Sequence, residues 1–465
     1  MEKNIWGHIS LGAFHRSHQA SYIHDYNYLG QDKWFIHSTG MLSSDNELIQ
    51  KMKNQNNQYS LMTRSGTKDE LMNIESISET YFLPEEWNKI IEVYSAPETK
   101  VVSITVTEKG YYYDSNRKLR VDLEQITSED LEKCPKNVYS VLLRVLQKRI
   151  STDLKLTILS CDNLPENGDL TKKLLFEYLS IHKEKFSPEL KGWIKNNVSF
   201  PNSMVDRITP VVTQETINLV NKSLSKTDEC PVVSESYREW IIENNFLNDF
   251  PDLQKVGVKI ENEVLPYEVM KVRLLNGSHS ALSYISFLLG YTDVDKALAD
   301  PLVYRFVNEY MIHDVLPTVP KVNGVNLPEY VETLLKRFSN RSISDKVQRL
   351  AQDGSEKIKN AILPVLIENL KASRSNKYIY FAIATWIKYL KGTDEKGLKI
   401  KIDDSNLSQI TTALQKKDFI VEFLSIKDIF NNILEEYPQL SEEVSAIYYE
   451  IDVSGVRSSL QKLLK

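Results

Sequence analysis

The stretch IWGHISLGAF, residues 5–14, decides the expected fold of the N-terminal half of the chain. Its first five residues are typical of a short strand, and a helical stretch follows from His15 to about Tyr28. A strand, a turn of small residues and a helix form the first unit of a dinucleotide-binding fold, in which backbone amides receive a pyrophosphate. Only one glycine of the usual G-x-G-x-x-G pattern is present, so this motif is a weak signal by itself. The candidate cofactor-binding residues of the turn are Gly12, Ala13 and Phe14.

A second strand, predicted over Trp34–Ser38, carries the information on cofactor type. Asp45 follows this strand within a few residues. An acidic side chain there binds the ribose 2′-hydroxyl of NAD and repels the 2′-phosphate of NADP, so Asp45 favours NAD. Alternatively, Asp45 caps a helix that starts at Asn46, and the two roles are compatible.

Two further apolar runs, Lys100–Val106 and Leu154–Ser160, are predicted to be strands buried on both faces of a parallel sheet. Ligands of such sheets bind beyond the carboxyl ends of the strands. Glu108, which follows the first run, is therefore a candidate substrate-binding residue, although a loop carboxylate is more often simply solvated. Asn163 follows the second run in the same way.

The remaining pattern divides the chain into two domains. Helices are predicted from about Asp169 to Lys185, with Gly168 and Asp169 as the start signal, and around Trp240. From about Pro266 the strand signals nearly vanish and amphipathic helical runs take over. These runs are Ala281–Leu289, Tyr304–His313, Tyr330–Phe338 and Phe381–Leu390. We therefore expect an α/β, Rossmann-type, doubly wound domain over residues 1–265 and a mainly α-helical domain over residues 266–465, which carries substrate and catalytic residues.

The segment YEVMKVRLLNGSHS, residues 267–280, is the strongest candidate for chemistry. On a helix that turns about 100° per residue, Lys271, Asn276 and His279 fall within an arc of roughly 140°, so one side presents all three. The alternatives are a solvated lysine, an Asn-Gly helix end and a structural histidine.

Composition excludes several classes of partner. The net charge of −6 gives no reason to expect nucleic acid or an anionic membrane. The N-terminus does not resemble a signal peptide, and no run of about 18 apolar residues is present, so we expect a cytoplasmic protein with a small-molecule substrate. Three separated cysteines and the absence of C-x2-C and H-E-x-x-H patterns predict no metal site. The oligomeric state stays open.

Several longer motifs are spread along the chain. They are His8-Ile9, Gly12–Ala20 (GAFHRSHQA), Thr107-Glu108, Gly110-Tyr111, Ser160–Pro165 (SCDNLP), Phe200–Pro210 (FPNSMVDRITP), Pro266–His279, Arg337–Asn340 (RFSN), Asp353–Ser355 and Tyr389–Gly392 (YLKG). Together they resemble the long-chain polyol dehydrogenases, from about residue 5 to the C-terminal LQKLLK.

The resemblance implies a role for each matching residue. The implied roles are Lys271 as general base, Asn163 and Asn276 as the amide pair that holds the reacting oxygen, His279 as ligand of a substrate hydroxyl, Glu268 as the carboxylate that passes the proton to solvent, and Asp206, Arg349 and Lys357 as lining of the polyol site. The implied activity is NAD-dependent, metal-independent oxidation of mannitol to fructose, and the reverse.

Alternatives within the family are reduction of a hexuronate such as fructuronate or tagaturonate, and oxidation of arabinitol. A uronate needs a cation for its carboxylate, and Arg349 or Lys357 supplies one. A catalytically idle relative that binds nucleotide is the third alternative. Two departures bear on the cofactor: Ser10 stands where the family has the first glycine of the phosphate loop, and Ser44 stands where an acidic residue occurs. NADP is therefore the second choice after NAD.

Overall fold

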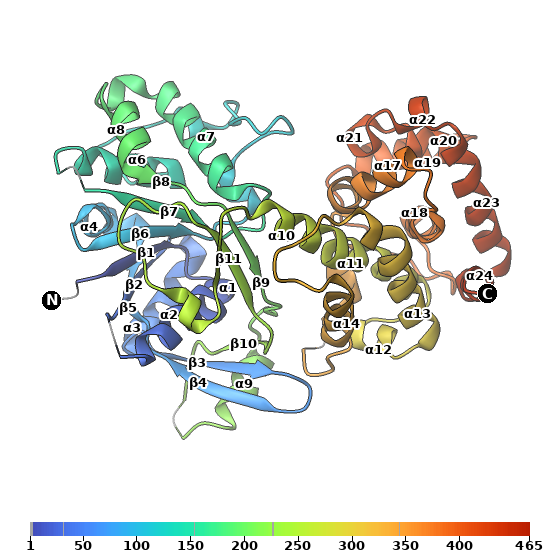
Figure 1. Ribbon diagram of the computed structural model, residues 1–465, viewed down its shortest axis with the longest axis horizontal. Coiled ribbons are helices and arrows are strands. Elements are labelled where there is room, and N and C mark those ends of the chain that lie inside the picture. Colours follow the sequence, from blue (N-terminus) through green and yellow to red (C-terminus); the bar gives the residue numbers. More distant parts are fainter. Residues whose placement is uncertain (1–2, 31, 153, 226, 344) are drawn as a thin grey trace. The chain divides into compact units, whose positions relative to one another are not determined.

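The computed structural model of the protein describes residues 3–30, 32–152, 154–225, 227–343 and 345–465. The chain divides into two compact units, Met1–Leu265 and Pro266–Lys465. The first unit contains a central parallel sheet with helices, and the second is built of helices (Figure 1). This confirms the predicted fold class of a Rossmann-type domain followed by a mainly helical one.

The central sheet of the first unit has six strands in the order β5-β2-β1-β6-β7-β8, and all neighbours are parallel. Its strands are β1 (Ile5–Ile9), β2 (Phe35–Gly40), β5 (Ile77–Phe82), β6 (Thr99–Ile104), β7 (Leu156–Ser160) and β8 (Val198–Ser199). The first strand lies in the middle, and the order reverses between β1 and β6. Such a reversal is the point at which doubly wound sheets bind dinucleotides.

Helices cover both faces of this sheet, and Figure 1 shows α6, α7 and α8 on one side with α2 and α3 on the other. The helices of the first unit are α1 (Ala13–Ser17), α2 (Gln19–Tyr28), α3 (Asn46–Asn54), α4 (Leu83–Ser95), α5 (Glu124–Thr127), α6 (Val138–Arg149), α7 (Asn167–Ile181), α8 (Leu190–Asn197) and α9 (Gln214–Asn221). Val101 belongs to the hydrophobic cluster on one face, and Val102 belongs to the cluster on the other. Neighbouring residues of a strand point to opposite faces, so a strand covered on both faces needs a continuous apolar run such as the one around Val101 and Val102.

Two small sheets extend the first unit. One has the order β10-β3-β4 and the other β12-β11-β9. Their strands are β3 (Tyr59–Arg64), β4 (Asp69–Ile74), β9 (Ser203–Asp206), β10 (Val232–Glu235), β11 (Glu239–Glu243) and β12 (Lys259–Glu261). The antiparallel pairs β3–β4 and β9–β11 are additions to the alternating pattern of strands and helices that the sequence indicated.

The prediction that Trp240 lies on a helix is wrong. Trp240 lies on β11 and is fully buried, with its ring centroid 6.1 Å from that of Trp6 and 5.5 Å from that of His18. Aromatic and β-branched residues favour strands, and the run Trp240–Ile242 is of this type. The contacts of Trp240 with Trp6 and His18, which lie more than 200 positions away in the sequence, also favour the strand over a helix.

Two predicted helices have different ends in the structure. The helix expected from His15 to Tyr28 is broken at His18, which separates α1 from α2 and whose Nε2 lies 3.0 Å from the carbonyl oxygen of Glu239. Helix α7 begins at Asn167, two residues before the predicted Asp169, and ends at Ile181.

The start of α7 is capped from a distant segment. The backbone N–H groups of Gly168 and Asp169 donate to Oδ1 of Asn202, at 2.9 and 3.2 Å. Such a cap leaves no signal in the local sequence. Gly168 is also packed against backbone, because a Cβ atom there would lie 2.5 Å from the carbonyl oxygens of Phe200 and Pro201.

Replacing Gly168 by alanine is expected to lower the free energy of unfolding by about 1–3 kcal/mol, the usual cost of forcing an extra carbon into a packed site. Gly192, in the first turn of α8, is the matched control, because no described atom lies within 4 Å of its would-be Cβ. Its replacement by alanine should stabilise the protein by about 0.5–1 kcal/mol. Urea unfolding followed by circular dichroism measures both changes. Equal stability of the two variants would contradict the close contact at Gly168.

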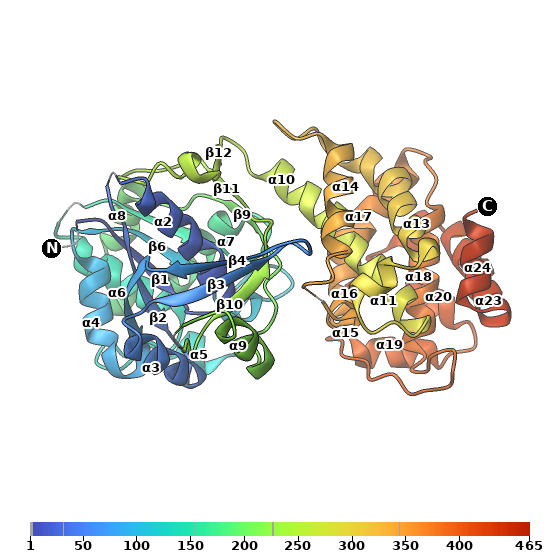
Figure 2. The ribbon, with the colours of Figure 1, turned by 90° about the horizontal axis from the view of Figure 1, so that it is seen from below.

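The second unit consists of helices in its described residues, and Figure 2 shows them from a second side. They are α10 (Leu265–Met270), α11 (Gly277–Leu288), α12 (Val294–Leu298), α13 (Pro301–Glu309), α14 (Leu327–Phe338), α15 (Val347–Ala351), α16 (Gly354–Lys357), α17 (Leu363–Lys371), α18 (Lys377–Leu390), α19 (Leu407–Leu414), α20 (Phe419–Leu424), α21 (Lys427–Phe430), α22 (Ile433–Glu436), α23 (Gln439–Ser454) and α24 (Val456–Leu463). Helix α18 packs against both α11 and α23. In the part of the chain that the structure describes, we find no helix with the length and apolarity needed to cross a bilayer.

Among the described residues of this unit, three segments are π-helical: Lys271–Asn276, Tyr310–Val315 and Ile358–Ile362. The first contacts each of the other two. The three segments approach one another at Gly277, where a Cβ atom would lie 2.9 Å from Oη of Tyr310 and 3.7 Å from the carbonyl oxygen of Ala361. Single π-helical turns inside α-helices are rare and occur often at functional sites.

Candidate functional site

The predicted site residues of the first unit lie at one edge of the central sheet. Gly12 follows β1, Asp45 follows β2, Glu108 follows β6 and Asn163 follows β7. The carboxyl ends of parallel strands share an edge, so the fold brings these four loops to the same side of the sheet.

The loop between β1 and α1 is the turn for which a pyrophosphate contact was predicted. Helix α1 begins at Ala13, and among the described residues no side chain caps its first amides. Gly12 is exposed and has no side chain to obstruct a ligand. Uncapped amides at the start of a helix, preceded by a glycine, can hold phosphate oxygens. The ring of Phe14 stacks on that of His18, with centroids 5.0 Å apart, which joins α1 to the start of α2.

Two buried histidines, His8 on β1 and His15 on α1, flank this loop in the sequence. The rings of His8 and His15 are stacked, with centroids 3.4 Å apart and planes 8° from parallel. His8 also contacts the hydroxyls of Ser103 at 2.6 Å and Thr105 at 2.9 Å, which belong to the end of β6 and the loop after it. Burial lowers the pKa of His15 to about 3 and places the pKa of His8 well below its ordinary value, so both rings are neutral near pH 7. The sequence analysis missed this pair, although a histidine on each side of the turn was visible.

The side chain of Asp45 forms a hydrogen bond within the turn after β2. Its Oδ2 accepts a hydrogen bond from the backbone N–H of Leu42 at 2.9 Å. In the described structure its side chain does not cap α3, so the alternative role as cap of the helix at Asn46 is wrong. Gly40 makes room for it, because a Cβ there would lie 2.7 Å from the Cβ of Asp45. The proposed contact with ribose stays a prediction.

The loop after β7 holds Asn163 at an exposed position next to the buried Asp162. The carboxylate of Asp162 accepts hydrogen bonds from the backbone N–H groups of Val106 and Thr107, at 3.0 and 2.8 Å, and from the hydroxyl of Tyr111 at 2.9 Å. These bonds join the ends of β6 and β7. Burial raises the pKa of Asp162 to about 6. The sequence analysis assigned no role to Asp162, although it directly precedes Asn163 in the SCDNLP motif.

Glu108 and Asp206 occupy two different surroundings. Glu108 is exposed, and its Oε1 accepts a hydrogen bond from the hydroxyl of Tyr113 at 2.9 Å. Asp206 is only 5% exposed and ends β9, a strand that starts where the hydroxyl of Ser203 donates to the carbonyl oxygen of Ser160 at 2.6 Å. The strand β9 therefore begins beside the end of β7, at the same edge of the sheet as Asn163.

In the second unit, Glu268, Lys271, Asn276 and His279 lie along one helical segment, residues 265–288, that includes a π-helical part. Glu268 and Lys271 are 7% and 6% exposed, and Asn276 and His279 are half-buried. The expectation of about 100° per residue is wrong between Lys271 and Asn276, because i→i+5 bonding turns the chain less at each residue. The order and the shared helix were predicted, but the angles between the side chains were not.

His279 lies among charged groups of the same unit. Its ring packs against Phe338 with centroids 4.7 Å apart. Burial lowers the pKa of His279 to about 3, and the cation of Arg349 acts in the same direction. The ring is therefore neutral at physiological pH, with one nitrogen that donates a hydrogen bond and one that accepts.

Arg349 and Lys357 both contribute charge to the surroundings of His279. Their predicted role as lining of a polyol site stays a prediction. Arg349 is engaged in a two-contact ion pair with Asp345, with Nε 2.7 Å from Oδ1 and a second contact between Nη2 and Oδ2. The Nζ of Lys357 donates to the carbonyl oxygen of Leu350 at 3.1 Å. Burial lowers the pKa of Lys357 to about 8, helped by the charge of Arg349. The partner Asp345 was missed, although its i,i+4 spacing to Arg349 was visible in the sequence.

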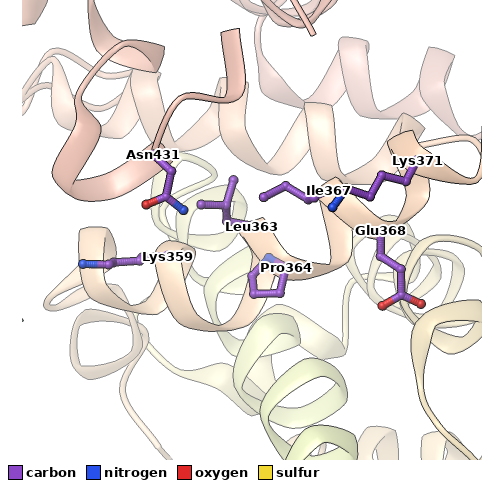
Figure 3. Close-up of a pocket in the computed structure, with 7 residues that line it drawn as sticks. All are labelled: Lys359, Leu363, Pro364, Ile367, Glu368, Lys371 and Asn431. Carbon is purple, nitrogen blue, oxygen red and sulfur yellow. The ribbon is translucent and has the colours of Figure 1, made fainter. Parts of the chain in front are cut away.

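A surface hollow of about 380 Å³ lies elsewhere in the second unit. Figure 3 shows Leu363, Pro364 and Ile367 flanked by Lys359 and Lys371. The described lining also includes Glu368 and Asn431 but none of the predicted site residues. Among the described residues there is also no group of three or more His, Cys, Asp or Glu placed to hold a metal ion.

Comparison with known protein families decides the identity of this arrangement. The mannitol dehydrogenase Rossmann domain matches residues 6–255, and the mannitol dehydrogenase C-terminal domain matches residues 263–452. The chain belongs to the mannitol dehydrogenase family. Both units of the structure therefore correspond to the two domains of that family.

Individual relatives match over nearly the whole length. Mannitol 2-dehydrogenase of Neosartorya fischeri is 32% identical, over 98% of this chain and 92% of the relative. D-mannonate oxidoreductase of Escherichia coli is 33% identical, over 98% of this chain and 95% of the relative. The solved structure of Pseudomonas fluorescens mannitol 2-dehydrogenase, a ternary complex with NAD and D-mannitol, matches with a TM-score of 0.87 and 34% identity, over 99% of this chain and 94% of that one. These matches confirm the predicted resemblance, most specifically to mannitol 2-dehydrogenase, and the prediction of an oxidoreductase.

Proposed function

We propose that this member of the mannitol dehydrogenase family interconverts mannitol and fructose with NAD. The observation that carries the proposal is the full-length likeness to the Pseudomonas fluorescens enzyme whose structure contains NAD and D-mannitol. The uncapped start of α1 and the carboxylate of Asp45 are suitable for the pyrophosphate and a ribose 2′-hydroxyl. NADP is the second choice of cofactor, and no metal takes part in the proposed reaction.

The proposed mechanism divides the chemistry among side chains of both units. When bound, NAD supplies the hydride acceptor. Lys271 takes the proton of the reacting hydroxyl, and the amides of Asn163 and Asn276 donate to the oxygen on which charge develops. Glu268, three residues before Lys271 on the same helix, passes the proton to solvent.

Substrate hydroxyls are bound by the remaining polar groups. His279, neutral by virtue of its low pKa, donates to or accepts from one hydroxyl. Lys357 and Arg349 lie close enough to influence its charge and are proposed to line the same pocket. Asp206 and Glu108 are proposed substrate contacts from the first unit. A site rich in hydrogen-bonding groups rejects a wrong substrate, because some of these groups then stay unpaired.

Reduction of a keto-hexuronate is the second candidate, favoured by the likeness to D-mannonate oxidoreductase of Escherichia coli. The substrate of such a reaction carries a carboxylate and needs a cation. The charge of Arg349 is already paired with Asp345, which leaves Lys357 as the cation for that carboxylate. Because the ion pair with Asp345 neutralises Arg349, the site favours the neutral sugar over the uronate.

Turnover of NADH with fructose and with fructuronate, measured from pH 6 to 9, tests the proposal. We expect kcat/KM to be at least about tenfold higher with fructose than with fructuronate, because Arg349 is already paired with Asp345, and to survive a metal chelator. NADPH in place of NADH should give lower rates because of Asp45. A preference for fructuronate would overturn the mannitol assignment.

The pH dependence of the ratio between the two substrates identifies the carboxylate ligand. Lys357 is charged below its pKa of about 8 and neutral above it. If a uronate is the substrate, the ratio of its kcat/KM to that of fructose falls as the pH rises through 8, and Lys357→Met removes this fall. If fructose is the substrate, the ratio stays low and flat, and groups common to both reactions cancel.

A further inference from the structure

Ser10 has a backbone conformation that favours glycine. It occupies the first glycine position of the G-x-G-x-x-G pattern, the one required for the tight turn after β1. Its φ is +120°, in the region that side-chain-bearing residues rarely adopt. The N–H of Ser10 donates to the carbonyl oxygen of Thr39 at 2.8 Å, which ties the turn to the end of β2. The fold therefore imposes this conformation on a serine.

The side chain of Ser10 engages the phosphate loop itself. The backbone N–H of Gly12 donates to Oγ of Ser10 at a distance of 3.3 Å. Gly12 stands at the second glycine position, where the backbone approaches a pyrophosphate most closely. The hydroxyl thus accepts the hydrogen bond that a phosphate oxygen would otherwise accept.

We propose that Ser10 is an affinity-determining residue, which weakens the binding of nucleoside diphosphates by competing with phosphate for the Gly12 amide. The inference rests on the proposed use of NAD and adds a residue that lowers the affinity for this cofactor. Binding of a diphosphate requires the Ser10 hydroxyl to leave the amide, so part of the interaction energy is spent on breaking the bond within the loop.

The surroundings of the loop keep its backbone in place when Ser10 changes. The stacked rings of His8 and His15 join the residues on its two sides, and His8 is tied to Ser103 and Thr105. Substitution at position 10 therefore changes the side chain while leaving the path of the backbone fixed. Two variants separate the two effects of Ser10: Ser10→Ala removes only the hydroxyl, and Ser10→Gly also removes the backbone strain.

Calorimetric titration of the full-length protein with ADP, adenosine and NADH measures the effect. For both variants we expect the Kd of ADP and of NADH to fall about 2- to 10-fold, the value of one neutral hydrogen bond. The Kd of adenosine, which has no phosphate, should be unchanged. Ser10→Gly should in addition raise the Tm by about 2–4 °C, whereas Ser10→Ala should not.

Ser373 provides a matched control. It is an exposed serine with a φ of +53° in the second unit. Ser373→Gly should raise the Tm in the same way, and neither Ser373→Ala nor Ser373→Gly should alter the Kd of ADP. An effect of these control variants on ADP binding would overturn the specific role of Ser10.

Each outcome at Ser10 decides the inference. Weaker ADP binding by Ser10→Ala would show that the hydroxyl donates to the phosphate and would overturn the proposal. Equal ADP binding by wild type and both variants would overturn it while leaving the proposed NAD function intact. No binding of ADP or NADH by any of the three proteins would overturn both, and binding by the variants alone would support the role of Ser10.

Discussion

Replacing Lys271 by methionine is expected to lower kcat by about 10³-fold, within the range of 10²–10⁴ that a positioned acid–base group contributes. Lys271 is only 6% exposed, so methionine, which has a similar length, fills its space without leaving a cavity. The Kd of NADH and the Tm should stay close to those of the wild type. Steady-state kinetics in both directions, with calorimetric titration of NADH, measures these quantities.

Chemical rescue sharpens the test of Lys271. In a Lys271→Ala variant, which leaves room near the missing amine, added methylamine should restore part of kcat, and more of it at a pH where the amine is unprotonated. Lys359→Met is the matched control, because Lys359 also lies on a π-helical segment of the second unit and lines the hollow of Figure 3. Near-normal turnover by Lys271→Met would refute the proposed mechanism.

Removal of either proposed oxygen ligand should cost almost as much. Asn163→Ala and Asn276→Ala are each expected to lower kcat by about 10²–10³-fold, the value of one hydrogen-bond donor directed at a developing oxyanion. The KM of NADH should change little, because neither amide is proposed to contact the cofactor. Stopped-flow measurement of hydride transfer separates this effect from the release of product.

The double variant tests whether the two amides serve one oxygen. Two donors to the same atom act as a unit, so the loss of kcat in Asn163→Ala/Asn276→Ala should be smaller than the product of the two single losses. Unchanged Tm values of all three variants provide the control for folding. Strictly multiplicative losses would argue against a shared oxygen, and a loss below about tenfold for either single variant would remove that residue from the mechanism.

Local sequence patterns were sufficient for much of the fold. Strand β1 spans Ile5–Ile9 as predicted, because a short apolar run before a small-residue turn has few other solutions. The run Lys100–Val106 reads as a buried strand, and β6 indeed lies within a sheet covered on both faces. The helical second half followed from amphipathic periodicity alone.

The candidate site was predicted as a set of residues rather than as a geometry. Helical spacing singled out Lys271, Asn276 and His279, the resemblance implied their roles, and the structure places all three on one helical segment. Neither the spacing nor the resemblance gave a role to Asp162 or Asp345, which are joined to their neighbours by hydrogen bonds and an ion pair. Such supporting residues touch no substrate in the proposed mechanism, so a motif that describes reaction chemistry omits them.

The sequence by itself determined the α/β and helical composition and the strand and turn at residues 5–14, because these depend on residues that are close together along the chain. The type of chemistry was indicated by motifs spread along the whole chain. The tertiary structure decided the strand at Trp240, the cap that Asn202 supplies to α7 and the positive φ of Ser10. It also decided the π-helical turn that begins at Lys271. The first three depend on contacts and hydrogen bonds between residues far apart in sequence, and the π-helical turn packs against two distant π-helical segments. Local preference cannot report such partners, because their free energy is gained only when distant segments meet.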